Sequence, residues 1–364
     1  MGGRMLRHWV SFPLKSVRKI QDRHQAIDAF ISQEEIKEEA VLRLKNIGDI
    51  ERLMSKIATQ KVAPRELIQL KNSLLELVPL KAALVDSSKK VLQSLGLGLH
   101  NCDELIETLR STLREEAPVS TTKGDFIADG FSEELDELRN LRKSGKDHLD
   151  RMVEQETERT GISSLKIAFN NVFGYYIEVR NTHKDKVPEE WIRKQTLVNA
   201  ERYITEELKD YEVKILGAQD RIQTLELTYY AELLKNIQNT LGVLKQNAIQ
   251  IATLDCLVGF TLLAQKHNYN CPQLIEGTDL IIKAGRHPVI ENQLAVGESY
   301  IANDVSLNRE EQQIIMITGP NMSGKSALLR QTALIVILAQ MGSFVPAQEV
   351  SMGIVDKIFT RVGA

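Results

Sequence analysis

Residues 312–341 read QQIIMITGPNMSGKSALLRQTALIVILAQM, and this stretch decides the fold of the C-terminal part of the chain. A short apolar run, a loop bounded by glycines and a second apolar segment follow one another without a break. The apolar run at residues 314–317 is typical of a buried parallel strand, and the apolar spacing over residues 327–339 is typical of a helix. The order therefore predicts a strand, a loop and a helix that begins near Ser326.

The loop matches the pattern G-x-x-x-x-G-K-[ST] through Gly319, Gly324, Lys325 and Ser326. In this pattern, backbone N–H groups surround phosphates, the lysine reaches the terminal phosphates and the hydroxyl holds Mg²⁺. The positive end of the dipole of the following helix points at the same anion. We therefore expect a nucleoside triphosphate with Mg²⁺ at this loop; the alternative is a plain glycine-rich turn.

The length and composition indicate an ordinary soluble protein of two or three domains. The chain has 364 residues, of which 43% are hydrophobic and 26% are charged. Its formal net charge of −3 gives no overall basic excess, so any contact with DNA has to be local. The longest purely apolar run near the C-terminus, residues 333–339, is far below the ~18 residues of a membrane span. We see no targeting signal and expect an intracellular protein without a membrane partner.

The three cysteines predict neither a disulfide framework nor a zinc site. Cys102, Cys256 and Cys271 are odd in number and lack C-x-x-C spacing. This usage is typical of reduced thiols that serve as small buried apolar residues. We expect no metal at these positions.

The N-terminal half reads as helices with a small β module inserted. Apolar residues recur at helical spacing over residues 1–120, in segments that we expect the prolines to interrupt, and again over residues 132–160. For the second of these helices, Ser132 is the expected N-cap and Gly161 the expected end. Residues 165–169 and 175–179 then alternate apolar and polar, which predicts a hairpin, and a third extended piece is expected over residues 196–204. The prolines concerned are Pro13, Pro64, Pro79 and Pro118.

A long helix is expected to return from Thr205, which is a good N-cap with two acidic residues in the first turn. Apolar residues separated by three and four positions form a heptad seam from Leu208 to Tyr229. We expect this helix to pair antiparallel with the helix over residues 132–160, with the β module at the tip of the pair. The alternative is a coiled coil between two chains.

After Pro272 the composition changes to short strand-like pieces, such as residues 280–283 and the GRHPVIE segment at residues 285–291. Residues 273–364 therefore look like the opening of an α/β nucleotide-binding domain. Hydrolysis of a nucleotide at such a loop needs a carboxylate at the end of a second strand, and no apolar segment ending in paired acids follows Ser326. Asp356 is expected in a turn or a partner contact. We expect a fragment that ends before its ATPase domain is complete, binds nucleotide weakly and hydrolyses it poorly or not at all.

Four sets of distinctive stretches occur along the chain: GGRMLRHWVSFPL, NNVFGYYIEV with QTLVNAERYITEELKDYE, GRHPVIE, and ITGPNMSGKSALLRQTALI with FTRVGA. Together they resemble the MutS family of bacterial DNA mismatch-repair ATPases. The resemblance implies a fold that is mainly α with a small β clamp module, plus the N-terminal part of an α/β P-loop ATPase domain of the ABC type. The implied domains are a helical core with an outgoing lever at 1–149, a β-rich DNA clamp at the lever tip at 150–206, a returning lever and core at 207–272, and the truncated ATPase domain at 273–364.

The resemblance also implies the residues of the nucleotide site. Ser326 would supply the hydroxyl to Mg²⁺, and Tyr300 would stack on adenine, its alternative being an ordinary packed tyrosine. Many members have Gly at position 323 and Thr at position 327, whereas this chain has Ser323 and Ala327; both replacements are small. The implied phosphate-lining residues are Gly319, Pro320, Asn321, Met322, Ser323, Gly324, Lys325 and Ser326.

The implied DNA contacts lie in the β module, which in this family grips the DNA backbone. Between residues 163 and 204 the chain carries seven cationic and five acidic side chains, a net charge of +2. The expected contacts are Arg193, Lys194, Asn199 and Arg202, and the alternative for each is a solvated surface position.

The implied function is that of a DNA mismatch-repair protein, an ATP-dependent clamp that binds mismatched double-stranded DNA and acts as a DNA-dependent ATPase when complete. The implied cofactors are ATP or ADP and Mg²⁺, and the implied partners are a second subunit of the same type in a homodimer and a MutL-type repair factor. The expected location is the bacterial cytoplasm, in association with the nucleoid. The alternatives are a relative that acts on branched or recombination DNA and a coiled-coil chromosome-structure ATPase; the latter places its phosphate loop before the helical arm, the reverse of the order here.

Overall fold

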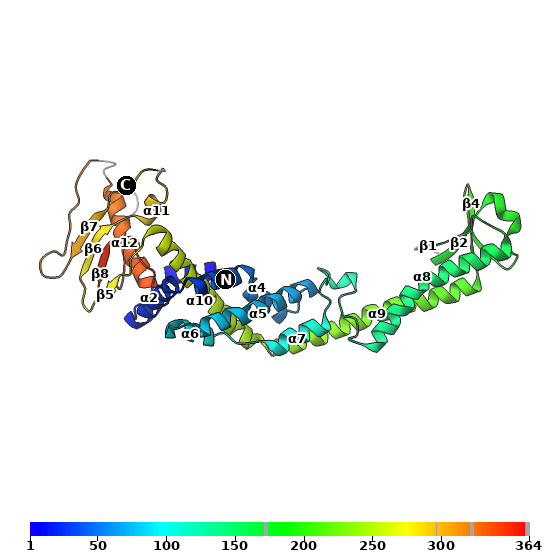
Figure 1. Ribbon diagram of the computed structural model, residues 1–364. Helices are drawn as coiled ribbons and strands as arrows, with labels where there is room; N and C mark the ends of the chain where they lie inside the picture. Colours follow the sequence, from blue (N-terminus) through cyan, green and yellow to red (C-terminus); the bar gives the residue numbers. More distant parts are fainter. Residues whose placement is uncertain (171–173, 296, 321–323, 361–364) are drawn as a thin grey trace. The chain divides into compact units, whose positions relative to one another are not determined.

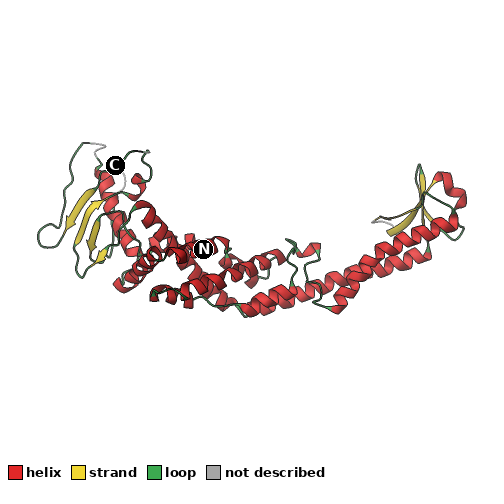
Figure 2. Ribbon diagram, in the orientation of Figure 1, coloured by secondary structure: helices red, strands yellow, loops and turns green. Residues whose placement is uncertain are grey.

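The computed structural model describes residues 1–170, 174–295, 297–320 and 324–360 (Figures 1 and 2). As expected, the chain is mostly helical with small sheets. It divides into two compact units. Unit 1 comprises residues 1–59, 69–106 and 239–364, and unit 2 comprises residues 60–68 and 107–238.

The helical part of unit 1 is built around α10 (Leu241–His267), which packs against α1 (Gly2–Ser11), α2 (Val17–Ser32), α3 (Glu34–Asn46) and α4 (Ile50–Ala58). By length and composition alone α10 is apolar enough to cross a membrane, but 61% of its apolar window is buried inside the protein, as is usual for a core helix. Trp9 of α1 packs on Phe260 of α10 with ring centroids 6.0 Å apart. The remaining helices are α6 (Lys90–Leu97) and parts of α5 (Pro64–Val85) and α7 (Asp103–Thr112), which contribute residues to both units.

The expectation that Pro79 interrupts a helix is wrong, because Pro79 lies inside α5. A proline in a helix interior removes one backbone hydrogen bond and costs about 3 kcal/mol. Leu80 and Leu84, which follow it in the same helix, are fully buried. Burial of two leucine side chains contributes about 1.5–3 kcal/mol each and offsets this cost.

The C-terminal part of unit 1 is a four-stranded sheet in the order β5-β8-β6-β7 with helices α11 (Pro288–Glu291) and α12 (Lys325–Met341). β6 runs antiparallel to both neighbours, and β5 runs parallel to β8. Ile335, Val336 and Ala339 of α12 pack on Ile282 and Val305 of the sheet in one apolar core. The strands are β5 (Gln273–Leu274), β6 (Leu280–Gly285), β7 (Asn303–Leu307) and β8 (Glu349–Met352).

The strand expected at residues 314–317 is not formed in the structure. Ile314 is 84% exposed and Met316 is 86% exposed, and the sheet ends at β7. A strand needs a neighbour that completes its backbone hydrogen bonds, and no strand in the described part of the chain pairs with this segment. The apolar run indicates that these residues favour burial, but it carries no information about which strand would pair with them.

Unit 2 contains two long helices, α8 (Glu133–Thr160) and α9 (Glu206–Gln238), and a sheet in the order β1-β2-β4-β3, antiparallel throughout. Figure 1 shows the two helices side by side with the strands at one end. The short 3-10 helices are η1 (Thr121–Lys123) and η2 (Asn181–Lys186). The strands are β1 (Lys166–Asn170), β2 (Gly174–Arg180), β3 (Ile192–Thr196) and β4 (Ala200–Ile204).

The antiparallel pairing of α8 and α9 within one chain is confirmed. Successive positions toward the C-terminal end of α8 contact successive positions toward the N-terminal end of α9. Ser132 is hydrogen-bonded to Tyr229, Arg142 is hydrogen-bonded to Gln219, and the His148 ring packs against the Tyr211 ring. Two of the seven seam residues of α9, Tyr211 and Tyr229, are half-buried. The other five are buried, as the heptad spacing predicts: Leu208, Ile215, Ala218, Ile222 and Leu225.

The expected helix ends are also confirmed. The Ser132 hydroxyl accepts a hydrogen bond from the backbone N–H of Leu135 at 3.4 Å, and the Thr205 hydroxyl accepts one from Leu208 at 3.1 Å. Gly161 ends α8 in the left-handed conformation with φ 68°. The apolar pattern after Thr205 is divided between two helices, since α9 ends at Gln238 and α10 begins at Leu241.

The third extended piece expected over residues 196–204 is instead part of a hairpin, in which β3 and β4 are joined by a turn at residues 197–199. Within the turn, the backbone N–H of Leu197 donates to the Ala200 carbonyl at 2.8 Å. The Asn181 side chain donates to the Val198 carbonyl at 2.9 Å and holds the turn from outside. An apolar-polar alternation predicts extended backbone but does not show where the chain reverses.

Candidate functional site

The loop at residues 319–326 ends where α12 begins, so the first N–H groups of this 17-residue helix face the loop. Gly324 has φ 87°, in the left-handed region that favours glycine. The Lys325 ammonium donates hydrogen bonds to the carbonyls of Gly319 and Pro320, the latter at 2.6 Å. The predicted loop residues Asn321, Met322 and Ser323 lie outside the described residues.

These features fit a phosphate group with Mg²⁺. The ammonium lies against the loop beside a helix N-terminus, where both charge and dipole favour an anion. Ser326 lies in the first turn of α12 and is exposed, so its hydroxyl can be reached by a metal ion. The structure thus brings together five of the predicted residues, Gly319, Pro320, Gly324, Lys325 and Ser326.

The predicted aromatic residue lies beside the same helix. The Tyr300 hydroxyl donates a hydrogen bond of 3.0 Å to the side-chain oxygen of Gln331, which is in α12. Tyr300 is half-buried, and burial raises the pKa of its hydroxyl, so the phenol stays protonated and able to donate. Gln331 was not predicted as a site residue, because in the sequence it reads only as one polar residue in an apolar helix.

The GRHPVIE segment at residues 285–291 stabilises the local fold. His287 is buried, and its Nδ1 accepts hydrogen bonds of 3.3 Å from the backbone N–H groups of Val289 and Ile290, capping the short helix α11. Burial lowers the pKa of His287. This favours the neutral ring that can accept those bonds. Arg286 forms an ion pair of 2.7 Å with Glu291.

A cleft of 970 Å³ opens along the first turns of α12. Ser326, Leu328 and Leu329 line it from the helix, and Ile315 and Ile317 line it from the segment that was expected to be a strand. The lining is mainly apolar, with Asp304, Arg330 and Lys357 among its charged residues.

The four predicted DNA contacts lie in the hairpin β3–β4 of unit 2, and three of them are on the surface. Lys194 and Asn199 are exposed, and Arg193 is exposed with a distant ion pair to Glu201 at 3.4 Å. These side chains are accessible to a phosphate backbone.

Arg202 differs, because the sheet already occupies its guanidinium. Its Nε donates to Glu178 at 3.2 Å, its Nη1 donates to Gln195 at 2.8 Å, and its Cζ atom lies 4.3 Å from the centre of the Tyr176 ring. Its side chain is only 18% exposed. A contact between Arg202 and DNA would have to break these bonds, so the structure favours a role for Arg202 in holding the sheet.

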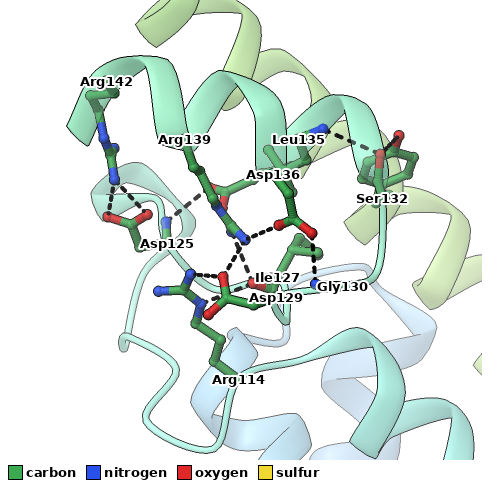
Figure 3. Close-up of polar contacts among 12 residues, drawn as sticks. Arg114, Asp125, Ile127, Asp129, Gly130, Ser132, Leu135, Asp136, Arg139 and Arg142 are labelled. Atoms are coloured by element: carbon green, nitrogen blue, oxygen red, sulfur yellow. Dashed lines mark hydrogen bonds and ion pairs between the residues drawn. The ribbon is translucent and has the colours of Figure 1, made fainter. Parts of the chain in front are cut away.

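A buried charged cluster at the start of α8 was missed by the sequence analysis (Figure 3). Arg139 donates to Glu226 of α9 at 2.7 Å and to the Ile127 carbonyl at 2.9 Å, and both charged side chains are buried. The other oxygen of Glu226 accepts a 2.9 Å bond from the backbone N–H of Asp125. The cluster therefore fastens the segment before α8 to both long helices. No clear signal of it is present in the sequence, because Arg139 is one of many charged residues in α8.

Comparison with known proteins gives two family matches. The family model described as MutS domain III matches residues 1–261, and that described as MutS domain V matches residues 315–364. "DNA mismatch repair protein MutS" of Flavobacterium johnsoniae is 58% identical over 364 residues, 100% of this chain and 42% of that relative. The proteins with the same name from Christiangramia forsetii and Bacteroides thetaiotaomicron are 57% and 53% identical over the same shares of each chain. The chain thus spans 42% of the length of these relatives.

Proposed function

Because this chain belongs to the MutS family, we propose that it is part of a DNA mismatch-repair ATPase that binds mismatched duplex DNA under the control of ATP. The observation that carries this proposal is the Lys325 ammonium held against the loop carbonyls at the N-terminus of α12. The names of the relatives support mismatch repair over an action on branched DNA.

In this proposal each part of the chain has a separate task. Residues 1–149 form a helical core and outgoing lever, residues 150–206 form the DNA clamp, residues 207–272 form the returning lever and core, and residues 273–364 form the first part of a P-loop ATPase domain of the ABC type. The antiparallel pair α8–α9 with a sheet at one end supports the lever and clamp. The sheet packed on α12 supports the ATPase part.

The phosphates of ATP or ADP would be held by residues 319–326, where Asn321, Met322 and Ser323 complete the loop. Lys325 would neutralise the terminal phosphates, and Tyr300 would stack on the adenine. Ser326 would hold Mg²⁺, which, when bound, neutralises charge on the phosphate oxygens. Lys325 and the dipole of α12 act on the same anion from one side of the loop.

We propose that hydrolysis needs carboxylates other than those of this chain. After Ser326 the sequence has only two acidic residues, Glu349 and Asp356. Glu349 forms an ion pair of 2.7 Å with Lys283, and Asp356, which lies on a bend, forms one of 3.0 Å with Lys15. The chain alone would therefore bind nucleotide weakly and turn it over slowly, and the ATPase activity would belong to the full-length homodimer.

The clamp would hold the DNA backbone through Arg193, Lys194 and Asn199. Mismatched duplex DNA, a second subunit of the same type and a MutL-type factor are the proposed partners, in the bacterial cytoplasm at the nucleoid. The exposed cations of the β3–β4 hairpin support the DNA contact, because contacts to phosphates need accessible positive charge rather than a base-specific shape.

Replacement of Lys325 tests the nucleotide site. In the full-length protein, Lys325→Ala should weaken binding of a fluorescent ATP analogue about 10-fold to 100-fold, since a charge-assisted hydrogen bond to phosphate contributes about 1.5–3 kcal/mol. Lys283→Ala is the matched control, because Lys283 is an exposed lysine of the same unit that pairs with Glu349. Equal affinity of the Lys325→Ala variant and the wild type would rule out this site.

A further inference from the structure

Gln331 is a buried polar residue on the apolar side of α12. It is fully buried, in the same helix as the core residues Ile335, Val336 and Ala339. Burying an amide without hydrogen bonds costs several kcal/mol by transfer from water, so an apolar residue would be favoured at this position unless the amide has a partner. Its oxygen accepts the Tyr300 hydroxyl, whereas its NH₂ group has no partner among the described residues.

The strand β6 passes so close to this amide that the side chain has little freedom to turn away. A Cβ atom placed on Gly285, the last residue of β6, would lie 2.7 Å from the Gln331 Nε2 atom and 2.8 Å from the Ile282 side chain. Gln331 is thus enclosed between the β6 backbone and Tyr300. The Tyr300 hydroxyl is the one side-chain hydrogen bond that the described residues give to this amide.

The hydrogen bond joins Tyr300 to the helix that carries Lys325. Gln331 follows Lys325 by six residues, about 9 Å along the helix axis at 1.5 Å per residue. A tyrosine hydroxyl lies on the axis about which the ring spins. A bond to it therefore holds the position of the ring, and with it the backbone before β7, without fixing the spin of the ring.

We propose that Gln331 is a positioning residue that anchors Tyr300 to α12 and so sets the distance between the phosphate loop and the surface on which the nucleobase stacks. This inference rests on the proposed function, because it takes Tyr300 as the contact to adenine. The substrate class is a nucleoside triphosphate, and the part of the molecule that Gln331 affects is the base, since the triphosphate is held at the other end of the site by Lys325 and the loop.

A double-mutant cycle with two probes tests the proposal in the full-length protein. Tyr300→Phe removes the hydroxyl and keeps the ring, and Gln331→Met removes the amide at similar volume. Each change should weaken ATP binding about threefold to tenfold, and the double variant should bind no more weakly than the weaker single variant, because both remove the same bond. Inorganic tripolyphosphate, which has no base, should bind all three variants as it binds the wild type.

The outcomes separate this inference from the proposed function. Wild-type ATP affinity in Tyr300→Phe or Gln331→Met, fully additive losses, or an equal loss for tripolyphosphate would each overturn the role of Gln331. Weaker binding of both ATP and tripolyphosphate by Lys325→Ala would still support the nucleotide site. Unchanged binding of both by that variant would refute the site itself. If circular dichroism shows that Gln331→Met does not fold, Tyr300→Phe still breaks the same hydrogen bond, from the half-buried tyrosine. The test is then whether this variant loses affinity for ATP and keeps its affinity for tripolyphosphate.

Discussion

Among single residues, Glu226 has an unusual setting, because a fully buried carboxylate lies between two long helices. It accepts from Arg139 at 2.7 Å and from the Asp125 backbone at 2.9 Å, so both of its oxygens have donors. Removing one partner of a buried ion pair leaves the other charge without compensation, which costs far more than an exposed pair contributes. The stability of unit 2 should therefore depend on this one side chain.

Glu226→Ala should lower the free energy of unfolding of unit 2 by about 2–4 kcal/mol, because it removes the one buried counter-charge of Arg139 among the described residues and leaves only the more exposed Asp129 and Asp136, at 3.0 and 3.7 Å. Urea unfolding in a Trp9→Phe background, where Trp191 alone reports on unit 2, measures the change. The control is Glu134→Ala, whose exposed pair with Arg221 should contribute at most about 1 kcal/mol. Equal effects of the two replacements would contradict the expected importance of burial.

His24 makes the stability of unit 1 depend on pH. Burial lowers its pKa to about 4, and its ring lies edge-on to Phe344 at 6.0 Å. Between pH 6.5 and pH 4 the unfolded chain binds a proton here and the folded chain does not, so stability is full above pH 6.5 and falls by up to about 3 kcal/mol as the pH drops to 4.

His24→Gln should remove this part of the pH dependence, because a glutamine is neutral throughout the range. Urea unfolding of unit 1, followed by Trp9 fluorescence in a Trp191→Phe background, should show a shallower slope between pH 4 and pH 6.5 for the variant. His287, whose pKa is also lowered by burial, is present in both proteins and cancels in the comparison. Identical slopes would show that His24 titrates normally in the folded chain.

The sequence was sufficient to predict which residues of the loop lie together, because their arrangement depends on local spacing. Lys325 and Ser326 follow from a fixed spacing around a loop, and the structure brings them together with Gly319. Gln331 could not be predicted, because its role depends on a tyrosine 31 residues earlier in the chain. Arg202 was expected to contact DNA because it is a cation in a basic segment. The register shows that it lies directly across from an acidic residue, Glu178, and pairs with it.

Among the elements, helices were predicted better than strands. A helix carries its own hydrogen bonds and its own end signals, so Ser132, Gly161 and Thr205 could be read directly. A strand depends on a partner elsewhere in the chain, and for that reason the apolar residues 314–317 gave a wrong prediction. The reversal between β3 and β4 was missed, because a three-residue turn without glycine or proline gives a weak signal.

The end of α12 depends on a glycine and on an arginine from another helix. Gly342 has φ 82°, and a Cβ atom there would lie 2.6 Å from the side chain of Arg23. Arg23 donates to the Met341 carbonyl and lies 3.3 Å from the centre of the Trp9 ring. The last turn of the helix behind the phosphate loop is thus tied to α1 and α2 through one side chain.

Gly342→Ala should destabilise unit 1 by about 1–2 kcal/mol, from the left-handed backbone and the displaced Arg23. Gly259→Ala is the matched control, because Gly259 lies in α10 and a Cβ atom added there would have nothing within 4 Å. This replacement should stabilise unit 1 by up to about 1 kcal/mol. Thermal unfolding of both variants measures the difference. A stabilised Gly342→Ala variant would show that neither the cap nor Arg23 restricts this position.

At the scale of the whole molecule, the proposed activities lie in different units: the nucleotide loop belongs to unit 1 and the exposed hairpin cations to unit 2. Reversing the charge of Arg193 and Lys194 to Glu in the full-length protein should therefore weaken DNA binding about 10-fold to 100-fold at low salt and reduce the slope of log affinity against log salt by about 2. Binding of the fluorescent ATP analogue should not change.

The control for this prediction changes the net charge equally at a different place. Lys214→Glu with Lys235→Glu reverses two exposed lysines of α9, outside the sheet. The DNA affinities of the two double variants are compared by titration with mismatched duplex DNA, followed by fluorescence anisotropy over a series of salt concentrations. An equal loss in the two pairs would mean that overall charge, not the hairpin, governs the affinity.

The division of the chain also sets the order in which its parts can fold during synthesis. Every residue of unit 2 leaves the ribosome before α10, the helix against which α1 to α4 of unit 1 pack. Unit 2 can therefore fold as soon as α9 has been made. Trp9 can pack on Phe260 only after about 250 further residues have been made. Helices α1 to α4 therefore keep an apolar surface open until α10 has been made, so the nascent chain needs protection from aggregation along these helices.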